Sequence, residues 1–326
     1  MRVWWLILFL LTCVQQLEAQ GFSRIIGSNT RAELVSSVRV LDSNRYLFTG
    51  IDLVDTVSTE QSQWSLFTTD QDGNLEDYQR LGVDSSAVGT GWYNSDLVRV
   101  GHGLYRIGTY RNELDGVGQV QGLIARYDSQ LNVDTVMTLR ADSGELVLRS
   151  ILFEPPDRFL IYGETTDSVL STGVQGLILM MTDTLGNVLW ERTYGGSGID
   201  YASNLVRDTD STLLLVGGGN SFDDAPNTSG YITRVDLNGD TIWRTVFGRD
   251  GTGDCYPVMQ DPPFFVHCHL FPSGGPDSDA YLARLTSDGQ IEDKQFTSNG
   301  IPDGLSAHEQ LRDSSHILLA GVRKEG

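Results

Sequence analysis

The stretch Gly176–Gly219, GLILMMTDTLGNVLWERTYGGSGIDYASNLVRDTDSTLLLVGGG, is the clearest copy of a unit that recurs along nearly the whole chain. Its two apolar runs are too short for helices and are bounded by turn residues, which is typical of β-strands. Strands that are apolar on consecutive positions are covered on both faces. The stretch therefore predicts sheets that are stacked on one another rather than a single half-exposed sheet.

Two sequence anchors repeat in step along the chain. One is an apolar run that ends in glycine, and the other is a polar turn. The glycines are Gly50, Gly108, Gly163, Gly217 and Gly321, with Cys268 at the place of a sixth, and the turns begin at Asp70, Asp128, Asp183, Asp236 and Thr286. Successive copies of the first anchor lie 51 to 58 residues apart. Such a period indicates a repeat architecture, and four short antiparallel strands per unit predict propeller blades.

The two ends of the repeat set the expected number of blades. Residues 21–27, GFSRIIG, align with the fourth strand of the unit, and the chain ends on the first and second strands of another unit. We therefore predict an all-β propeller of four-stranded antiparallel blades, about six in number, with five complete and the last incomplete. Residues 21–326 would form this single domain, which is expected to be truncated at its C-terminus because the last blade lacks a strand.

The first twenty residues are interpreted as a secretory signal peptide. They contain a basic residue, Arg2, an apolar run Val3–Leu11 and a polar stretch that ends near Ala19. The apolar run is too short to span a bilayer, and no later run is long enough either. Lipid attachment at Cys13 is the alternative, although the preceding Thr12 fits it poorly. We expect a protein without a membrane span that is secreted or held at the outer cell surface.

The charge balance argues against one class of partner. The formal net charge is -20, and Lys294 and Lys324 are the only lysines. A nucleic-acid-binding protein needs a positive field, so no nucleic-acid partner is expected. The simplest interpretation is an acidic, well-solvated surface.

The turn sequence D-x-x-G-x-x-x-W occurs at Asp183–Trp190 and Asp236–Trp243. It resembles the blade motif of quinoprotein-type propellers, in which an Asp orders the turn and a Trp docks between blades. The wider pattern, over residues 21–321, resembles secreted propeller repeats common in Bacteroidota, many of which carry a sorting domain for type IX secretion. The resemblance implies architecture and no active-site residue. The other copies depart from the motif, with Glu76, Asp77, Thr135 and Glu292 in the region of the Trp.

Two groups of residues could bind metal. The turn Asp70–Asp77 lacks the full spacing and the bidentate Glu of a calcium loop, so a hairpin turn is favoured and calcium is the alternative. His267 and His269 would share one strand face at a spacing suited to a metal. No acidic residue or third histidine is evident nearby in the sequence, which favours structural histidines. We expect no cofactor.

Cys255 and Cys268 are expected to form a disulfide. The hairpin that contains them turns at Asp261–Pro262, and pairing Gln260 with Pro263 places the two cysteines directly opposite each other. Cross-strand neighbours have Cβ atoms about 4.5–5.5 Å apart, which can relax to disulfide geometry. Export makes such a bond permissible.

Function is expected on the face that carries the loops between strands two and three, because these loops are long and differ from copy to copy. Its acidic residues are Asp115, Asp167, Asp223, Asp224 and Asp279. They favour a cationic, metal-bridged or polyhydroxyl ligand, so the partner would be an unidentified protein or glycan. The sequence contains no G-x-S-x-G, no H-E-x-x-H and no phosphate-binding loop. The leading hypothesis is an exported, non-catalytic binding or cell-surface interaction scaffold. The alternative is a secreted propeller enzyme, either a glycan hydrolase or lyase or a quinoprotein-like oxidoreductase.

Overall fold

A computed structural model describes residues 32–42, 44–53, 62–81, 88–90, 96–111, 120–168, 170–171, 173–221, 229–247, 251–258, 264–272, 279–297, 303–310 and 316–322. Beyond residue 250, it describes side chains only for residues 284–292. All regular elements in these ranges are β-strands. None of the described residues belongs to a helix with the length and hydropathy needed to cross a membrane.

The strands form successive antiparallel sheets in chain order. Blade one contains β1 (Ala32–Asp42), β2 (Arg45–Leu53), β3 (Ser62–Asp70) and β4 (Leu75–Leu81). Blade two contains β5 (Val88–Thr90), β6 (Leu97–Val100), β7 (Gly103–Arg111), β8 (Val120–Tyr127) and β9 (Val133–Leu139). Blade three contains β10 (Leu146–Glu154), β11 (Arg158–Thr165), β12 (Gly176–Asp183) and β13 (Val188–Tyr194).

The second half of the chain repeats this arrangement. Blade four contains β14 (Asp200–Thr209), β15 (Thr212–Gly219), β16 (Ser229–Asp236) and β17 (Thr241–Phe247). Blade five contains β18 (Gly251–Val258), β19 (Phe264–Pro272), β20 (Asp279–Leu285) and β21 (Ile291–Thr297). Blade six contributes β22 (Asp303–Gln310) and β23 (His316–Val322).

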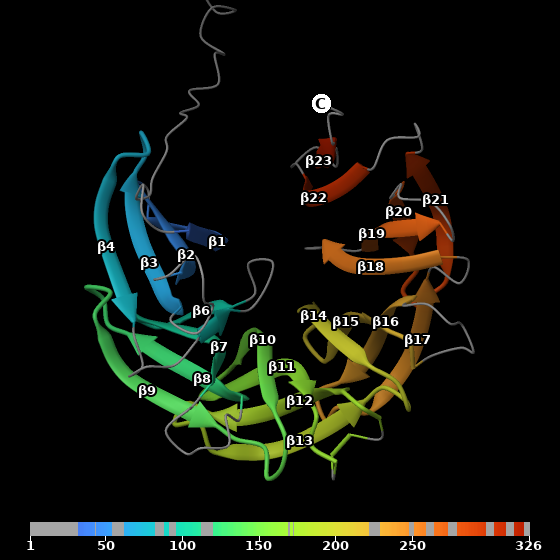
Figure 1. Cartoon of the computed structure of the whole chain (residues 1–326), viewed down its shortest axis with the longest axis horizontal. Helices are drawn as coiled ribbons and strands as arrows, with labels where there is room; N and C mark the ends of the chain where they lie inside the picture. The colour runs from blue at the N-terminus through green and yellow to red at the C-terminus, as the bar shows by residue number, and fades with distance from the viewer. Residues whose placement is uncertain are drawn as a thin grey trace, which may run out of the picture.

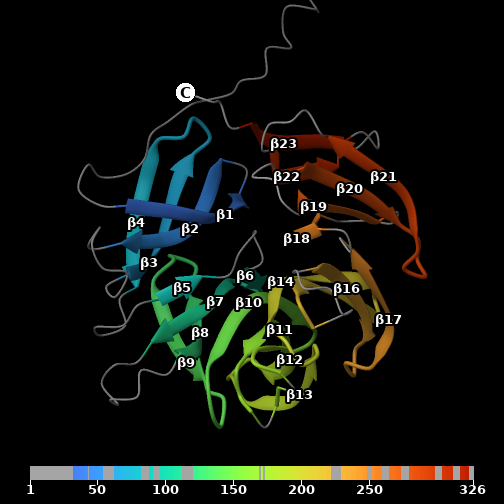
Figure 2. The same cartoon turned by 45° about the vertical axis from the view of Figure 1, so that its right-hand side comes forward.

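The sheets follow one another around a ring, with the first strand of each blade inside and the fourth strand outside (Figure 1). This arrangement confirms the predicted β-propeller with four-stranded antiparallel blades. Both views place β22 and β23 beside blade five and leave a gap between them and blade one (Figures 1 and 2). The predicted signal peptide and the predicted closing strand at residues 21–27 lie outside the described residues.

The hydrophobic core consists of layers between neighbouring blades. In the layer between blades three and four, Leu179 of β12 and Leu215 of β15 are fully buried. The first strand of the later blade also contributes: Leu205 in blade four and Ile151 in blade three are each 2% exposed. Val38 has the same position in blade one but is 43% exposed.

The repeated glycine has a structural cause that only the pairing of strands one and two shows. Gly50, Gly163 and Gly217 each lie opposite the start of a one-residue bulge in strand one. A β-carbon on Gly163 would overlap the carbonyl oxygen of Val147, and one on Gly217 would overlap that of Tyr201. The bulged strand bends over these residues, so a side chain cannot be accommodated there.

Two blades depart from this rule. In blade six the bulge pairs Leu305 with Ala320, so Ala320, and not Gly321 as predicted, has the position of Gly217. In blade five the strands pair without a bulge, and Cys255 lies opposite Cys268. The register of this hairpin is therefore as predicted, whereas the disulfide concerns side chains outside the described set.

The first strand of blade two is interrupted at the level of the bulge. β5 pairs with the far end of β7, where Thr90 faces Gly108, and β6 resumes with Leu97 opposite Arg106. Asp96 and Arg106 are both fully buried and lie 3.4 Å apart. The Arg106 guanidinium also donates to the carbonyl oxygens of Ser65 and Gly50, each at 2.8 Å. This pair therefore joins blade two to blade one.

The polar turns between strands three and four are hairpin turns built on one side chain. The Asp183 carboxylate accepts hydrogen bonds from the backbone N–H groups of Leu185 and Asn187, both at 2.9 Å, and from the Asn187 amide at 2.7 Å. Gly186 has a φ of 86°, which glycine adopts without strain. In blade two Leu131 takes this conformation, with a φ of 65°. Asp70 organises its turn in the same way.

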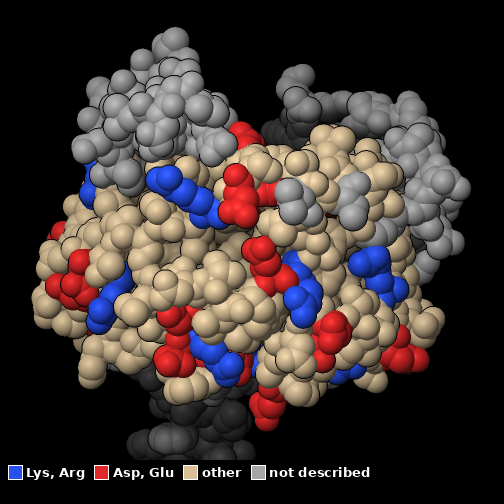
Figure 3. Space-filling model, turned by 90° about the horizontal axis from the view of Figure 1, so that it is seen from below, with Lys and Arg blue, Asp and Glu red and all other residues tan. Residues whose placement is uncertain are grey.

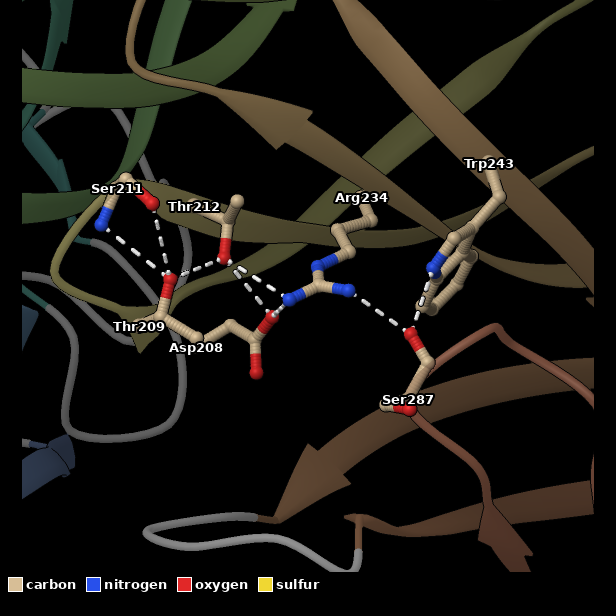
Figure 4. Close-up of polar contacts among 7 residues, drawn as sticks. All are labelled: Asp208, Thr209, Ser211, Thr212, Arg234, Trp243 and Ser287. Atoms are coloured by element: carbon tan, nitrogen blue, oxygen red, sulfur yellow. Dashed lines mark hydrogen bonds and ion pairs between the residues drawn. The ribbon is translucent and has the colours of Figure 1, made fainter.

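The tryptophans of the D-x-x-G-x-x-x-W motif lie between blades, as the resemblance implies. The Trp243 indole N–H donates to the carbonyl oxygen of Ser287 in the next blade at 3.1 Å, and Arg234 donates to the same oxygen at 2.8 Å (Figure 4). Arg234 also forms an ion pair with Asp208 at 2.5 Å. Trp190 packs against the core layer between blades three and four. Both tryptophans therefore stabilise blade contacts.

Candidate functional site: the variable-loop face

The described part of the variable-loop face lies mainly between blades three and four. Three backbone segments meet there, around Val174, Gly198 and Asn220. The Val174 N–H donates to the carbonyl oxygen of Gly198 at 3.0 Å, and the Asn220 N–H donates to that of Ile199 at 3.1 Å. A parallel bridge pairs Gln175 with Ile199. The loops of this region therefore form a connected platform rather than separate protrusions.

Glycines allow these segments to approach closely. A β-carbon on Gly173 would overlap the carbonyl oxygen of Gly196, and one on Gly198 would overlap the side chain of Asn220. The Asn220 side-chain oxygen in turn accepts from the Ile199 N–H at 2.7 Å. Because the contacts are mostly between main chains, the described segments of this platform are densely packed.

Glu164 is the central charged residue below the platform. It is 4% exposed and accepts hydrogen bonds from the Arg149 guanidinium at 3.1 and 3.3 Å. It also accepts from the Gln175 amide at 3.2 Å and from the backbone N–H of Ala202 at 3.0 Å. Buried charges require such partners, and here they join blade three to the first strand of blade four.

The structure corrects the role expected for Asp167. Its carboxylate is fully buried and accepts from the backbone N–H of Ser143 at 2.7 Å and from the Ser143 hydroxyl at 2.9 Å. Asp167 therefore joins its loop to the segment before β10 and is not part of an acidic surface for a ligand. Asp115, Asp223 and Asp224 lie outside the described residues. Asp279 is the first residue of β20, and only its backbone is described.

Asp200 is buried at the edge of the same platform. Its carboxylate accepts from the Gly196 N–H at 3.2 Å, while its other oxygen, Oδ1, has no hydrogen-bond partner. Burial raises the pKa of Asp200, and a hydrogen bond from Ser221 opposes this effect. Tyr162 is fully buried nearby. Its pKa is raised well above the ordinary value, first by burial and then by the charges of Glu164 and Asp200.

Two large apolar side chains of this region reach solvent. Val174 is 66% exposed in the platform, and Tyr201 is 46% exposed on β14, the innermost strand of blade four. An exposed tyrosine offers an apolar ring and a hydroxyl to a ligand. Sequence reasoning missed both residues, because it considered only the charged residues of the loops.

Metal-binding groups do not converge among the side chains that the structure describes. Within that set, no three His, Cys, Asp or Glu residues are arranged to hold a metal ion. The Asp70 carboxylate accepts from the backbone N–H groups of Asp72 and Asn74, which supports the hairpin-turn interpretation of Asp70–Asp77. The calcium alternative at that turn stays a prediction.

The predicted histidine pair lies on β19, where the structure describes the backbone. His269 is opposite Asp254, and His267 is opposite Tyr256. Sequence reasoning found no acidic neighbour for these histidines. The hairpin register deduced for Cys255 and Cys268 does provide an acidic neighbour, because the same register places Asp254 opposite His269.

The surface seen from below carries charges of both signs, scattered over mostly uncharged residues (Figure 3). No extended basic patch is visible among the described residues on this face.

Comparisons with known proteins show no family for this chain. No family model matches the chain, and no curated protein is significantly similar in sequence. Among solved structures, the β-propeller domain of the trilobed protease from Pyrococcus furiosus is similar over 92% of this chain and 80% of that one, at 11% identity and a TM-score of 0.49. A Synechocystis apocarotenoid oxygenase is similar over 84% of this chain and 63% of that one, at 12% identity and a TM-score of 0.47.

A third similar structure is a puromycin hydrolase, with 12% identity, a TM-score of 0.47 and coverage of 69% of this chain. The chain spans about a third of the length of that hydrolase and just under two thirds of the oxygenase. At these identities the likeness concerns the fold alone. The sheets and their order define the protein as a β-propeller.

Proposed function

We propose that this protein is an exported, non-catalytic β-propeller that binds a protein or glycan ligand through its variable-loop face. One observation carries the proposal: two acidic residues of that face, Glu164 and Asp167, are held by contacts within the fold. Glu164 is held by Arg149, Gln175 and Ala202, and Asp167 is held by Ser143. A glycosidase instead needs two carboxyl groups that face one substrate.

The platform between blades three and four gives the ligand a rigid support with exposed Tyr201 and Val174. Aromatic anchors on rigid elements are typical of binding surfaces. Export rests on the signal-peptide pattern of residues 1–20. Surface attachment by a type IX route rests on the resemblance of the repeat to secreted Bacteroidota propellers.

The test measures whether the purified mature chain binds to a glycan array and to the outer surface of intact producing cells. Val174→Asp and Tyr201→Ala are expected to abolish the strongest binding. Leu189→Asp, at a 53% exposed position on the outer strand β13, is the matched control and is expected to retain it. Loss of binding in Leu189→Asp as large as that in Val174→Asp and Tyr201→Ala would overturn the proposal. So would cleavage of a bound glycan, detected by mass spectrometry.

A further inference from the structure

Tyr201 is an exposed aromatic residue at the inner edge of blade four. It lies on β14, the innermost strand of that blade (Figure 1), and is 46% exposed. Its directly opposite neighbour on β15 is Gly218. Opposite residues share one face of a sheet, and a glycine there contributes no side chain that would cover the tyrosine ring.

Asn220 lies on the same side of this strand pair. It follows Gly218 by two residues, so it is a diagonal cross-strand neighbour of Tyr201, at about 7–8 Å. Its backbone N–H donates to the carbonyl oxygen of Ile199 at 3.1 Å, and its side-chain oxygen accepts from the Ile199 N–H at 2.7 Å. The amide nitrogen of Asn220 has no acceptor among the described residues, so its two N–H donors are available beside the ring.

Blade three has charged side chains at the equivalent positions. Glu164 has the strand position of Gly218, one residue after the repeated glycine, and the bulge residue Arg149 has that of Ser203. Arg149 and Glu164 form an ion pair at 3.1 Å. Blade four thus has a hydroxyl group and a glycine where blade three has a guanidinium and a carboxylate, and the surroundings of its exposed tyrosine carry neither of those charges.

The remaining surface of the platform is uncharged as well. In its described segments, residues 173–176, 195–201 and 219–221, Asp200 is the one ionisable residue apart from Tyr201, and Asp200 is fully buried. The exposed residues of these segments are Val174, Ser197, Tyr201 and Asn220. They offer a ligand an aliphatic group, a hydroxyl group, an aromatic ring and an amide.

We propose that the ligand of the variable-loop face is an uncharged glycan, and that one of its sugar rings stacks on Tyr201 beside Gly218. This inference rests on the proposed function and narrows its ligand. The tyrosine ring packs against the apolar face of the sugar, while the amide of Asn220 and the hydroxyl of Ser197 bind sugar hydroxyls. A few placed polar groups on an otherwise apolar surface fix the orientation of a small ligand.

The buried carboxylates argue against the cationic and metal-bridged ligands that the sequence also allowed. Such ligands need exposed charges of opposite sign. Glu164 is already paired with Arg149. Asp200 lies between Gly195 and Gly219, and a β-carbon on either glycine would overlap one of its carboxylate oxygens. Among the described platform residues, a cation would therefore meet no exposed carboxylate.

The experiment is calorimetric titration of the mature chain with uncharged tetrasaccharides of glucose, xylose, mannose and N-acetylglucosamine. Oligogalacturonate and a heparin-derived tetrasaccharide are the charged comparisons. At least one uncharged tetrasaccharide is expected to bind. Its Kd should change less than about 2-fold between roughly 50 and roughly 500 mM NaCl, because the complex contains no ion pair for salt to screen.

Substitutions in the site separate stacking from hydrogen bonding. Tyr201→Ala should weaken binding of the uncharged sugar at least ~10-fold, whereas Tyr201→Phe, which keeps the ring, should stay within about 3-fold of wild type. Asn220→Asp keeps the oxygen that accepts from Ile199 but removes the N–H donors, and should weaken binding about 5-fold or more. The control is Ser211→Ala, at an exposed position in a tight turn of the same blade, which should bind as wild type does. The urea midpoint of each variant verifies that it is folded.

Two results would overturn the inference. One is binding confined to the charged oligosaccharides, with a Kd that rises more than about 10-fold over the same salt range. The other is an unchanged affinity of Tyr201→Ala for the uncharged sugar. If the chain binds producing cells and loses that binding in Val174→Asp, but binds no uncharged glycan, this inference fails and the proposed function stands. If it binds neither cells nor glycans, both fail.

Discussion

The carbonyl oxygen of Tyr201 occupies the space where a β-carbon on Gly217 would stand. The bulge between Ala202 and Asn204 pushes this oxygen over β15. Gly163 has the same relationship with Val147 in blade three. The most regular feature of the repeat is thus a steric requirement of the bulged pairing of strands one and two.

Gly217→Ala is expected to destabilise the protein by at least ~2 kcal/mol, as overpacking against backbone does. The matched control is Gly103→Ala, where a β-carbon would meet its nearest atoms at an ordinary 3.5 Å. Urea unfolding followed by tryptophan fluorescence measures both. Equal effects of the two substitutions would show that the bulge does not require glycine.

Removal of the side-chain hydroxyl should affect the stability of the protein differently at two buried tyrosines. The Tyr162 hydroxyl has no hydrogen-bond partner, so Tyr162→Phe should be neutral or stabilising. The Tyr194 hydroxyl donates to the carbonyl oxygen of Gly239 at 2.7 Å, so Tyr194→Phe should cost about 1 kcal/mol. The difference in urea midpoint between the two variants is the measurement, and a larger loss for Tyr162→Phe would contradict it.

Asp200 should make stability depend on pH. Burial raises its pKa in the folded state, so the folded chain binds this proton more tightly than the unfolded chain, whose carboxyl titrates near ~3.9. The stability gained from protonation is complete below that value and is lost as pH rises through the folded-state pKa. Asp200→Asn should therefore raise the urea midpoint at pH 7, and the gain should vanish toward pH 4.

Asp183 provides the control of opposite sign. Hydrogen bonds from Asn187 and then from backbone N–H groups lower its pKa, so its contribution is present above the unfolded-state pKa and is lost as pH falls through the folded-state value. Asp183→Asn should lower the midpoint at pH 7, and less so in acid. The same direction of change for both variants at pH 7 would refute this assignment.

The disulfide between Cys255 and Cys268 stays a prediction, now on an observed register. A chain of residues 21–326, purified without reductant and then unfolded, should contain no thiol that reacts with Ellman's reagent. Replacing both cysteines by serine should cost roughly 2–4 kcal/mol, as loss of a disulfide does. Two reactive thiols in the unreduced chain would rule the bond out.

The sequence was sufficient to predict the period of the repeat, the polar turns and the register of the two cysteines, because each of these depends on local sequence patterns. It could not reveal why Gly217 is required, since the bulge exists only between two paired strands. It misplaced the equivalent residue in blade six for the same reason: Ala320, not Gly321, lies opposite the bulge.

The site was less predictable than the fold. Asp167 has the sequence context of an exposed loop acid, and its partner Ser143 is 24 residues earlier in the chain. Asp254 could have been identified from the sequence, because the register deduced for Cys255 also places Asp254 opposite His269.

The interruption of the innermost strand in blade two has a practical consequence. β5 and β6 both pair with β7, with Thr90 opposite Gly108 and Leu97 opposite Arg106. The Asp96–Arg106 pair secures the point of return. Six residues, 91–96, connect Thr90 to Leu97, whereas one residue of β7, Ile107, separates their partners. A change in the length of this connection is therefore expected to leave the register of both strands intact, which makes it an insertion point for a reporter peptide or a second binding loop.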